Sequence, residues 1–312
     1  MSLLVVATYP VEGGRVLDGA AELTEDGRLT IDGSPLPASQ GTYALLAAAC
    51  RTASFLDAPS PHALIAGDIG RGDGTRAAFK QLVETVSRIR PAVVVFHYMQ
   101  PIMALMRHAL AELAGACPDA LLVADAGGMY AAKAAGLAPR FELMTPDIGE
   151  IGFLADPKVS HPAYVGHHLL GGADFDPAAL AREAHENGGS SRVLLIKGAV
   201  DHVVEEGAVT AVIDEPNVPA LEAIGGTGDT ITGLASAFMA AGLDTVGAAI
   251  CAARANREAG VLMQATPAMS AADLVDRLPE VLVNHLEHAG NDRSRSRRSR
   301  RGESNPGPAH YE

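Results

Sequence analysis

Short apolar runs alternate with helical segments along most of this 312-residue chain, and no other feature limits the fold as strongly. Five of the runs have the length and composition of buried strands: 63–66, 92–96, 120–124, 141–144 and 193–196. Helical spacing of apolar residues fills the intervals, at 75–89, 102–114, 130–135, 148–154 and 177–187. Strands that are apolar throughout and alternate with helices indicate a parallel sheet covered on both faces. The sequence therefore predicts an α/β fold with a mainly parallel central sheet.

The two ends of the chain depart from this alternation. Residues 1–40 contain several glycine turns and are predicted to form a small β segment at the N-terminus. Residues 41–290 are predicted to form the main α/β domain, in which a hairpin turns at Glu206-Gly207. Residues 291–312 are rich in Arg and Ser, have no apolar face and are predicted to be a disordered tail. Three helices are expected to close the main domain, at 230–241, 245–259 and 271–289.

Composition excludes several classes of partner. The formal net charge is −13, although the segment 291–312 contains six Arg and only three acidic side chains. The acidic body argues against general nucleic-acid binding, because that binding needs Lys and Arg to neutralise phosphates. Cys50, Cys117 and Cys251 lie far apart without metal-type spacing, which fits buried thiols in a reducing compartment. No apolar run approaches ~20 residues and the N-terminus lacks a basic leader, so we expect a cytoplasmic protein without a membrane partner.

Polar or glycine-rich stretches follow the carboxyl ends of several predicted strands. Because ligands of parallel sheets gather at this edge, the sequence predicts an active site there. A lone histidine at such a place, His97, is more often a partner of backbone groups than a functional residue. The stretches are Gly67-Asp68, His97, Asp125, Thr145-Pro146-Asp147 and Lys197-Gly198.

A glycine-rich loop, Gly225-Gly226-Thr227-Gly228-Asp229, leads directly into an apolar helical segment. Glycine lets backbone N–H groups approach an anion, and the start of a helix directs its unpaired N–H groups and positive dipole end to the same place. Asp229 stands at that helix start, where a carboxylate either caps the helix or accepts a proton from a hydroxyl that attacks phosphorus. The loop therefore indicates a phosphate site with a base beside it, or an ordinary capped loop.

The order of four stretches resembles the ribokinase-like superfamily, and within it the ADP/ATP-dependent NAD(P)H-hydrate dehydratase branch. Residues 66–76 are similar to the early glycine loop of that branch, GPGLGR, and Thr145–Glu150 are similar to its TPHPGE motif. Residues 194–199 are similar to a strand that ends in Lys-Gly, and Gly225–Asp229 match the GGTGD loop. The resemblance covers roughly residues 41–260.

This resemblance implies a three-layer α/β/α fold and a nucleotide-dependent reaction with ADP or ATP and Mg²⁺. Asp229 would be the base, and Gly225, Gly226, Thr227 and Gly228 would form an anion hole. Other residues would surround the nucleotide or the substrate. Lys197 and Gly198 are assigned to the nucleotide, Glu150 and Asp147 to phosphate and Mg²⁺, and Gly67, Asp68, Gly70 and Asp125 to the substrate side. No direct structural metal site is expected.

Departures from the family pattern leave the substrate open. Asp147 stands where the dehydratase branch has His, and Asp68 stands where it has Pro. Three readings follow: a lyase that repairs hydrated NAD(P)H, a kinase for a sugar or vitamin-like alcohol, or a nucleotide-binding sensor without turnover. The partners would be a nucleotide and a small-molecule or dinucleotide substrate, with homo-oligomerisation left open.

Purely structural roles are alternative interpretations for individual site residues. Lys197 could simply end a strand in solvent, and Glu150 could be a first-turn acid favoured by the helix dipole. Asp125 could cap a turn rather than face the substrate. For Asp68, turn capping and substrate contact are equally compatible with the sequence.

Overall fold

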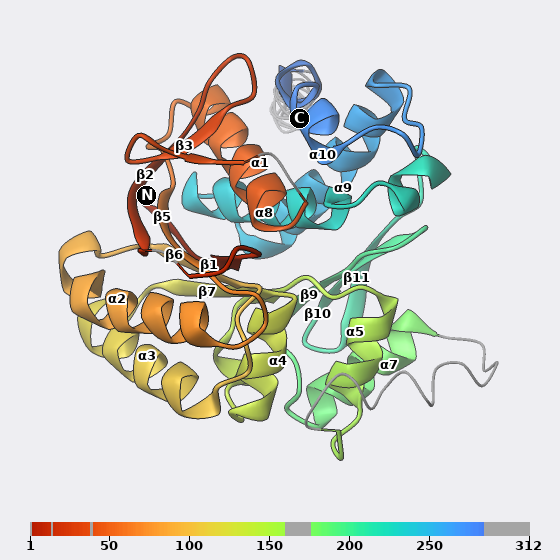
Figure 1. Ribbon diagram of the computed structural model, residues 1–312. Helices are drawn as coiled ribbons and strands as arrows, with labels where there is room; N and C mark the ends of the chain where they lie inside the picture. Colours follow the sequence, from red (N-terminus) through yellow and green to blue (C-terminus); the bar gives the residue numbers. More distant parts are fainter. Residues whose placement is uncertain (1, 14, 38–39, 160–175, 284–312) are drawn as a thin grey trace, which may run out of the picture.

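The computed structural model describes residues 2–13, 15–37, 40–159 and 176–283, which form a mixed α/β structure around an 11-stranded sheet (Figure 1). The strand order is β11-β10-β9-β8-β7-β6-β1-β5-β2-β3-β4. The six middle strands, from β9 to β5, pair in parallel, and both flanks are antiparallel. The strands are β1 (Leu3–Tyr9), β2 (Leu17–Leu23), β3 (Leu29–Ile31), β4 (Ser34–Leu36), β5 (His62–Gly67), β6 (Val93–His97), β7 (Leu121–Asp125), β8 (Leu143–Met144), β9 (Val193–Ile196), β10 (Asp201–Glu205) and β11 (Ala208–Ile213).

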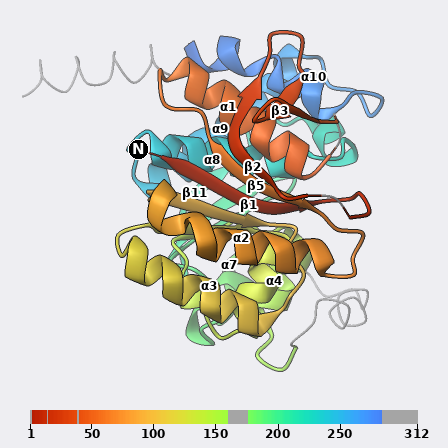
Figure 2. The ribbon, with the colours of Figure 1, turned by 60° about the vertical axis from the view of Figure 1, so that its left-hand side comes forward.

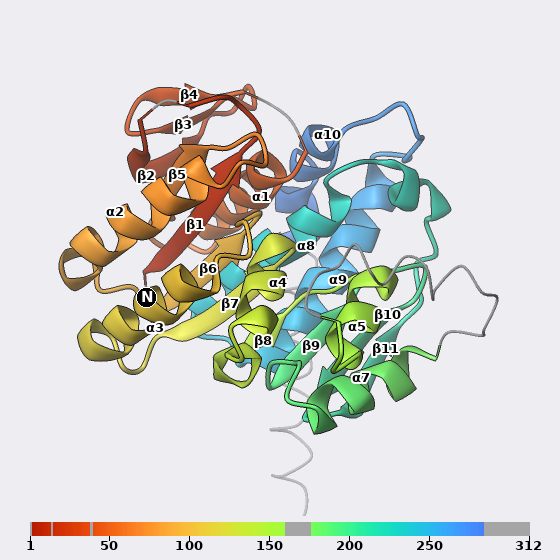
Figure 3. The same cartoon turned by 60° about the horizontal axis from the view of Figure 1, so that its bottom comes forward.

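Helices cover both faces of the sheet. One layer contains α1 (Thr42–Phe55), α8 (Thr227–Ala240), α9 (Thr245–Leu262) and α10 (Ala271–Val275). The other contains α2 (Asp73–Ile89), α3 (Met103–Ala116), α4 (Gly127–Ala134), α5 (Ile148–Ala155) and α7 (Pro177–Glu186), and Figure 3 shows this layer in front of the strands. Two short 3₁₀ helices, η1 (Ala138–Arg140) and η3 (Pro219–Ala223), lie in connections.

Alternation of side chains along the central strands separates the core into two halves. Val5 and Ala7 of β1 pack into the core with α1, α8 and α9, whereas Leu4 and Val6 pack into the core with α2, α3 and α4. Figure 2 shows α2 and α3 side by side below β1. Successive residues of a strand point to opposite faces, so a strand buried on both sides must be apolar throughout. The predicted three-layer arrangement with a mainly parallel sheet is confirmed.

The N-terminal residues are placed differently from the sequence-based expectation. The predicted boundary at residue 40 would set a small β segment apart from the main domain, but β1 lies inside the sheet between β5 and β6. Six of its seven residues are buried, which suits a central strand covered on both faces. Of the four N-terminal strands, β2, β3 and β4 continue the sheet as an antiparallel edge beyond β5, so the N-terminal segment belongs to the same sheet as the rest.

Two predicted elements have different bounds in the structure. The hairpin at 201–213 turns at Glu206-Gly207 as predicted, whereas the strand expected at 141–144 shrinks to β8. The last predicted helix, 271–289, is interrupted after Val275. Residues 284–290 and the predicted tail, 291–312, lie outside the described residues. Among the helices of the described ranges, none is long and apolar enough to span a membrane.

Candidate active site

A cavity of about 490 Å³ opens at the carboxyl edge of the sheet, between the start of α8 and the ends of β7 and β9. Elements far apart in sequence supply its wall, including η3 and the middle of α9. The structure brings most of the predicted site residues together here. Those that line the cavity are Asp125, Asp147, Glu150, Lys197, Gly198 and Gly225 to Asp229.

The anion loop, defined as Gly225 to Asp229, leads into α8 and includes its first residues. Gly226 has a φ of 95°, which strongly favours glycine, and an added Cβ on Gly225 would lie 2.1 Å from the side-chain amide of Gln40. No side chain caps α8, and among the described residues the N–H groups of Gly228 and Asp229 reach no acceptor. Unpaired N–H groups at a helix start form a site for an anion.

Asp229 lies in the first turn of α8, and its side chain is 12% exposed. Its Oδ2 atom accepts a hydrogen bond from the N–H of Gly41 at 3.2 Å, and its Oδ1 atom lies 2.8 Å from Nε2 of His97. Gly41 is the N-cap of α1, so two helices begin beside this carboxylate. Both helix dipoles favour its negative charge.

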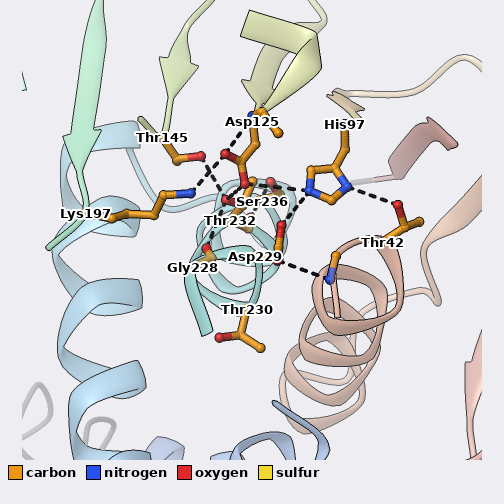
Figure 4. Close-up of polar contacts among 12 residues, drawn as sticks. Thr42, His97, Asp125, Thr145, Lys197, Gly228, Asp229, Thr230, Thr232 and Ser236 are labelled. Atoms are coloured by element: carbon orange, nitrogen blue, oxygen red, sulfur yellow. Dashed lines mark hydrogen bonds and ion pairs between the residues drawn. The ribbon is translucent and has the colours of Figure 1, made fainter. Parts of the chain in front are cut away.

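His97 is a neighbour of Asp229 that the sequence placed at a strand end but did not pair with this carboxylate. It ends β6, is fully buried, and lies between Asp229 and Thr42 rather than serving backbone groups (Figure 4). Tyr98, which follows it, lines the cavity and packs edge-on against the imidazole with ring centroids 4.3 Å apart. The position of His97 at a strand end was the one available signal, because its carboxylate partner lies 132 residues away.

Asp125 and Lys197 form a buried ion pair at the ends of β7 and β9. The ammonium lies 2.9 Å from Oδ1 of Asp125, and the hydroxyl of Thr232 donates to Oδ2 at 2.6 Å. Burial would raise the pKa of Asp125, but Lys197, His97 and Thr232 hold this pKa below its ordinary value. Burial would lower the pKa of Lys197, but the neighbouring carboxylates, Asp125 first, raise it.

Lys197 also reaches the anion loop. A Cβ added to Gly228 would lie 3.5 Å from its Nζ atom, so a permanent positive charge lies beside the N–H groups of that loop. Lys197 is 12% exposed and is therefore not the solvated strand end that the sequence left open.

Glu150 and Asp147 face the same cavity at the start of α5. Their side chains form a capping box, in which Asp147 accepts from the N–H of Glu150 at 2.7 Å and Glu150 accepts from the N–H of Asp147 at 2.9 Å. The hydroxyl of Tyr130 donates to Glu150 at 2.7 Å. Burial raises the pKa of Glu150 to about 7, although Lys197 opposes this shift.

Gly67, Asp68 and Gly70 do not line the cavity. Asp68 accepts hydrogen bonds from the N–H groups of Gly70, Gly72 and Thr75 at 2.9–3.0 Å, so it caps the loop before α2. Burial would raise its pKa, but these donors lower it. Of the two interpretations that the sequence allowed for Asp68, the structure shows turn capping.

Arg257 braces the far wall of the cavity and has no local sequence signal. It is 5% exposed, and its Nε donates to Asp201 at 2.8 Å. Asp201 in turn accepts from the N–H of Gly198 at 3.0 Å. The remaining donors of Arg257 bind the carbonyl oxygens of Gly198, Ala199, Asp214 and Pro216. This network holds the turn after β9 against α9.

His97, Asp125 and Asp229 also bring potential metal ligands within 4.8 Å of one another. The set does not suit a resident divalent ion, because Nε2 of His97 and Oδ1 of Asp229 already lie at hydrogen-bond distance and Lys197 occupies Asp125. A carboxylate held by an ammonium group is a poor further ligand for a cation.

A sequence model of the family described as NAD(P)H-hydrate dehydratase matches residues 99–280, which is more than half of the chain and includes the anion loop. The chain belongs to this family. Kinase-like proteins share its fold, and the family is one of enzymes.

The chain is also similar to individual proteins. An uncharacterized protein of Methanocaldococcus jannaschii, MJ1337, is 32% identical over 243 residues, which are 78% of this chain and all of that protein. The bifunctional NAD(P)H-hydrate repair enzyme Nnr of Hyperthermus butylicus is 37% identical over 123 residues. That match spans 38% of this chain and only 22% of the longer repair enzyme.

Solved structures agree on the fold. The ADP/ATP-dependent NAD(P)H-hydrate dehydratase from Bacillus subtilis, co-crystallised with ATP and Mg²⁺, superposes with a TM-score of 0.54 at 16% identity. The superposition covers 91% of this chain and 89% of that one. A ribokinase-like superfamily protein from Enterococcus faecalis superposes with the same TM-score at 13% identity, over 91% of this chain and 86% of that one.

Proposed function

We propose that this protein is a nucleotide-dependent dehydratase that repairs hydrated NAD(P)H, with ADP or ATP as the phosphoryl donor. The observation that carries the proposal is the anion loop with Asp229 and Lys197 at a single cavity. Free N–H groups, a helix dipole and an ammonium group suit a phosphate, and a carboxylate beside them suits a hydroxyl that is about to attack it. Membership of a family described as NAD(P)H-hydrate dehydratase supports the proposed substrate class.

In the proposed reaction, the hydroxyl of the hydrate attacks the terminal phosphoryl group of the nucleotide. Asp229 accepts the hydroxyl proton, while the unpaired N–H groups of Gly228 and Asp229 and the ammonium of Lys197 stabilise the charge on the transferred phosphoryl oxygens. The new phosphate ester is a better leaving group than hydroxide. The phosphoryl transfer breaks the bond between the terminal phosphorus and its bridging oxygen, which releases AMP from ADP or ADP from ATP. Elimination from the ester then expels inorganic phosphate and a ring proton and restores the dihydronicotinamide double bond.

Mg²⁺ fits the charge balance of the cavity. Asp125, Asp147 and Glu150 face it, and burial together with the first two carboxylates raises the pKa of Glu150 above its ordinary value. Such an excess of carboxylate over positive charge would suit a hydrated divalent cation beside the phosphates. Glu150 and Asp147 would hold this ion through its water ligands, and the ion would neutralise charge on the phosphates.

The direct test incubates the protein with enzymatically hydrated NADH, Mg²⁺ and either ADP or ATP, and follows the return of the dihydronicotinamide absorbance. Asp229→Asn keeps the shape of the base and is expected to lower kcat by about 10²–10⁴-fold. Mg²⁺ and nucleotide affinity, measured by calorimetry, should change little in this variant. Absence of recovery with both nucleotides would contradict the proposal.

A small-molecule kinase is the second candidate, and Asp147 is the residue that favours it. The family motif carries His at this position, so a changed contact beside the phosphates is compatible with a changed acceptor. A panel of sugars and vitamin-like alcohols, scored by ADP release, separates the candidates. A kinase releases ADP with an alcohol and leaves the hydrate unrepaired. A dehydratase repairs the hydrate and releases no ADP with the alcohols.

A further inference from the structure

A hydrogen-bond chain leads from the interior of the sheet to Asp229 through His97 (Figure 4). The hydroxyl of Thr42 donates to the carbonyl oxygen of Thr8 at 2.6 Å, and Nδ1 of His97 lies 3.2 Å from the same hydroxyl oxygen. On the other side of the ring, Nε2 lies 2.8 Å from Oδ1 of Asp229. Three elements of the fold, β1, α1 and β6, therefore fix the imidazole before it meets the carboxylate.

The donors and acceptors in this hydrogen-bond chain determine which atoms carry the protons. Thr42 has a single hydroxyl hydrogen, and a carbonyl oxygen at 2.6 Å accepts but never donates, so that hydrogen belongs to the bond with Thr8. The oxygen of Thr42 then accepts from His97, which places a proton on Nδ1. Nε2 faces a carboxylate oxygen, which also only accepts while it is ionised. One more proton must therefore lie between Nε2 and Asp229.

The charges around the ring favour keeping that proton on His97. Two carboxylates from different elements face Nε2: Asp229 of α8 at 2.8 Å and Asp125 of β7 at 3.8 Å. Lys197 at the end of β9 is the nearby cation, and it is bonded to Asp125 rather than to the ring. From the cavity side, the neutral phenol of Tyr98 packs edge-on against the imidazole. A buried cation is stable when paired and hydrogen-bonded in this way.

We propose that His97, protonated on both ring nitrogens, is a positioning residue that keeps Asp229 ionised and holds its free lone pairs toward the cavity. The proposal rests on the proposed function, because Asp229 matters as the base of that reaction. Loss of the Nε2 proton would leave two lone pairs facing each other across this short contact. The carboxylate would then turn away or take up a proton itself, and either change removes the base. The reaction rate should therefore fall on the alkaline side when His97 loses this proton.

The protonation state of His97 is tested on the wild-type protein without substrate, by nitrogen-15 NMR of its two ring nitrogens. The ring signals are assigned through correlations to the backbone of His97. At the pH of maximal activity, or at neutral pH if no turnover is found, two protonated ring nitrogens are expected. In Asp229→Asn the side chain can offer its amide N–H, so the second proton is no longer required and the ring should become neutral at lower pH. A neutral wild-type ring with an unprotonated Nε2 would overturn the proposal. This result is independent of whether the hydrate is the substrate.

The kinetic test compares pH profiles of kcat/KM for His97→Gln and for a matched control. Gln donates and accepts at fixed positions but does not titrate. We expect a loss of up to about 10²-fold near the optimum, together with loss of the alkaline limb expected of the wild type. His62→Gln is the control, since Nε2 of His62 lies 2.7 Å from Asp18 in a similar pair outside the residues that line the cavity. An unchanged alkaline limb in His97→Gln would contradict the proposal, because a purely structural role lowers the rate equally at every pH.

Discussion

The carboxylate of Asp229 receives its partners from residues that are remote in sequence: His97, 132 positions earlier, and the N–H of Gly41, 188 positions earlier. Asp229 itself could be identified from sequence because a glycine-rich loop before a helix is a local pattern. The partners could not be identified, because only the order of the strands brings the ends of β6 and α1 to α8. The same reason explains why Arg257, which braces the turn after β9, gave no signal.

Glu150 provides a pH-dependent prediction at this scale. Its pKa in the folded protein is about 7, above the ordinary value of 4.5, so folding favours the protonated form. The corresponding stability is fully present below about pH 4.5 and is lost as the pH rises through 7. Glu150→Gln cannot ionise. Between pH 4.5 and pH 8 the wild type should therefore lose on the order of 1–3 kcal/mol of unfolding free energy relative to this variant.

Urea unfolding at both pH values measures this difference, and titration of groups that do not interact with Glu150 cancels in the comparison. The variant also loses part of the capping box with Asp147, but that loss is the same at every pH. Glu84→Gln on the exposed side of α2 is the control, and its difference from the wild type should stay constant. If the difference in unfolding free energy between Glu150→Gln and the wild type were also the same at both pH values, burial would not raise the pKa of Glu150.

At the scale of elements, the sequence predicted those features that depend on neighbouring residues, such as turns. The hairpin between β10 and β11 was predicted because Glu206-Gly207 is a turn signal flanked by apolar alternation. The capping role of Asp68 was one of two open interpretations, since a sequence does not show which donors surround a carboxylate. Strand β8 is shorter than expected because only two of its residues pair with both neighbours.

The anion loop allows a matched pair of glycine substitutions at one helix start. Gly226→Ala forces an L-residue to a φ of 95° and places its Cβ 3.1 Å from Ala44 and Ala271, so about 1–3 kcal/mol of stability should be lost. At Gly228 the backbone is helical, and an added Cβ makes an ordinary contact at 3.5 Å with Lys197. Gly228→Ala should therefore keep or slightly raise the stability of the fold.

Nucleotide affinity distinguishes the role of the anion loop in folding from its proposed role in phosphate binding. The Gly228→Ala methyl group occupies the space beside the Lys197 ammonium, where a phosphate oxygen would lie, so calorimetry should show weaker ADP or ATP binding by about tenfold or more. Thermal unfolding without nucleotide serves as the control for folding. Unchanged nucleotide affinity in Gly228→Ala would indicate that the phosphates bind away from this loop.

On the scale of the whole molecule, the sequence predicted the class of fold but not the position of its first strand. Apolar runs alternating with helices specify a parallel sheet, and the structure has one. The run Leu3–Tyr9 has the same character as the predicted central strands, yet its position before a glycine-rich region suggested a separate segment. Strand order is decided by how helices pack on both faces, and no local pattern in the N-terminal segment encodes it.

Native-state hydrogen exchange on the intact protein tests this placement. Strand β1 pairs on both sides, with β5 and β6, and its side chains enter both halves of the core. Its amides should therefore exchange only through global unfolding, with the same free energy as those of β6. Strands β3 and β4, three residues each at the end of the sheet, are the internal control and should exchange through local opening. If β1 exchanged together with β3 and β4 instead, residues 1–40 would be an independent unit, as the sequence alone suggested.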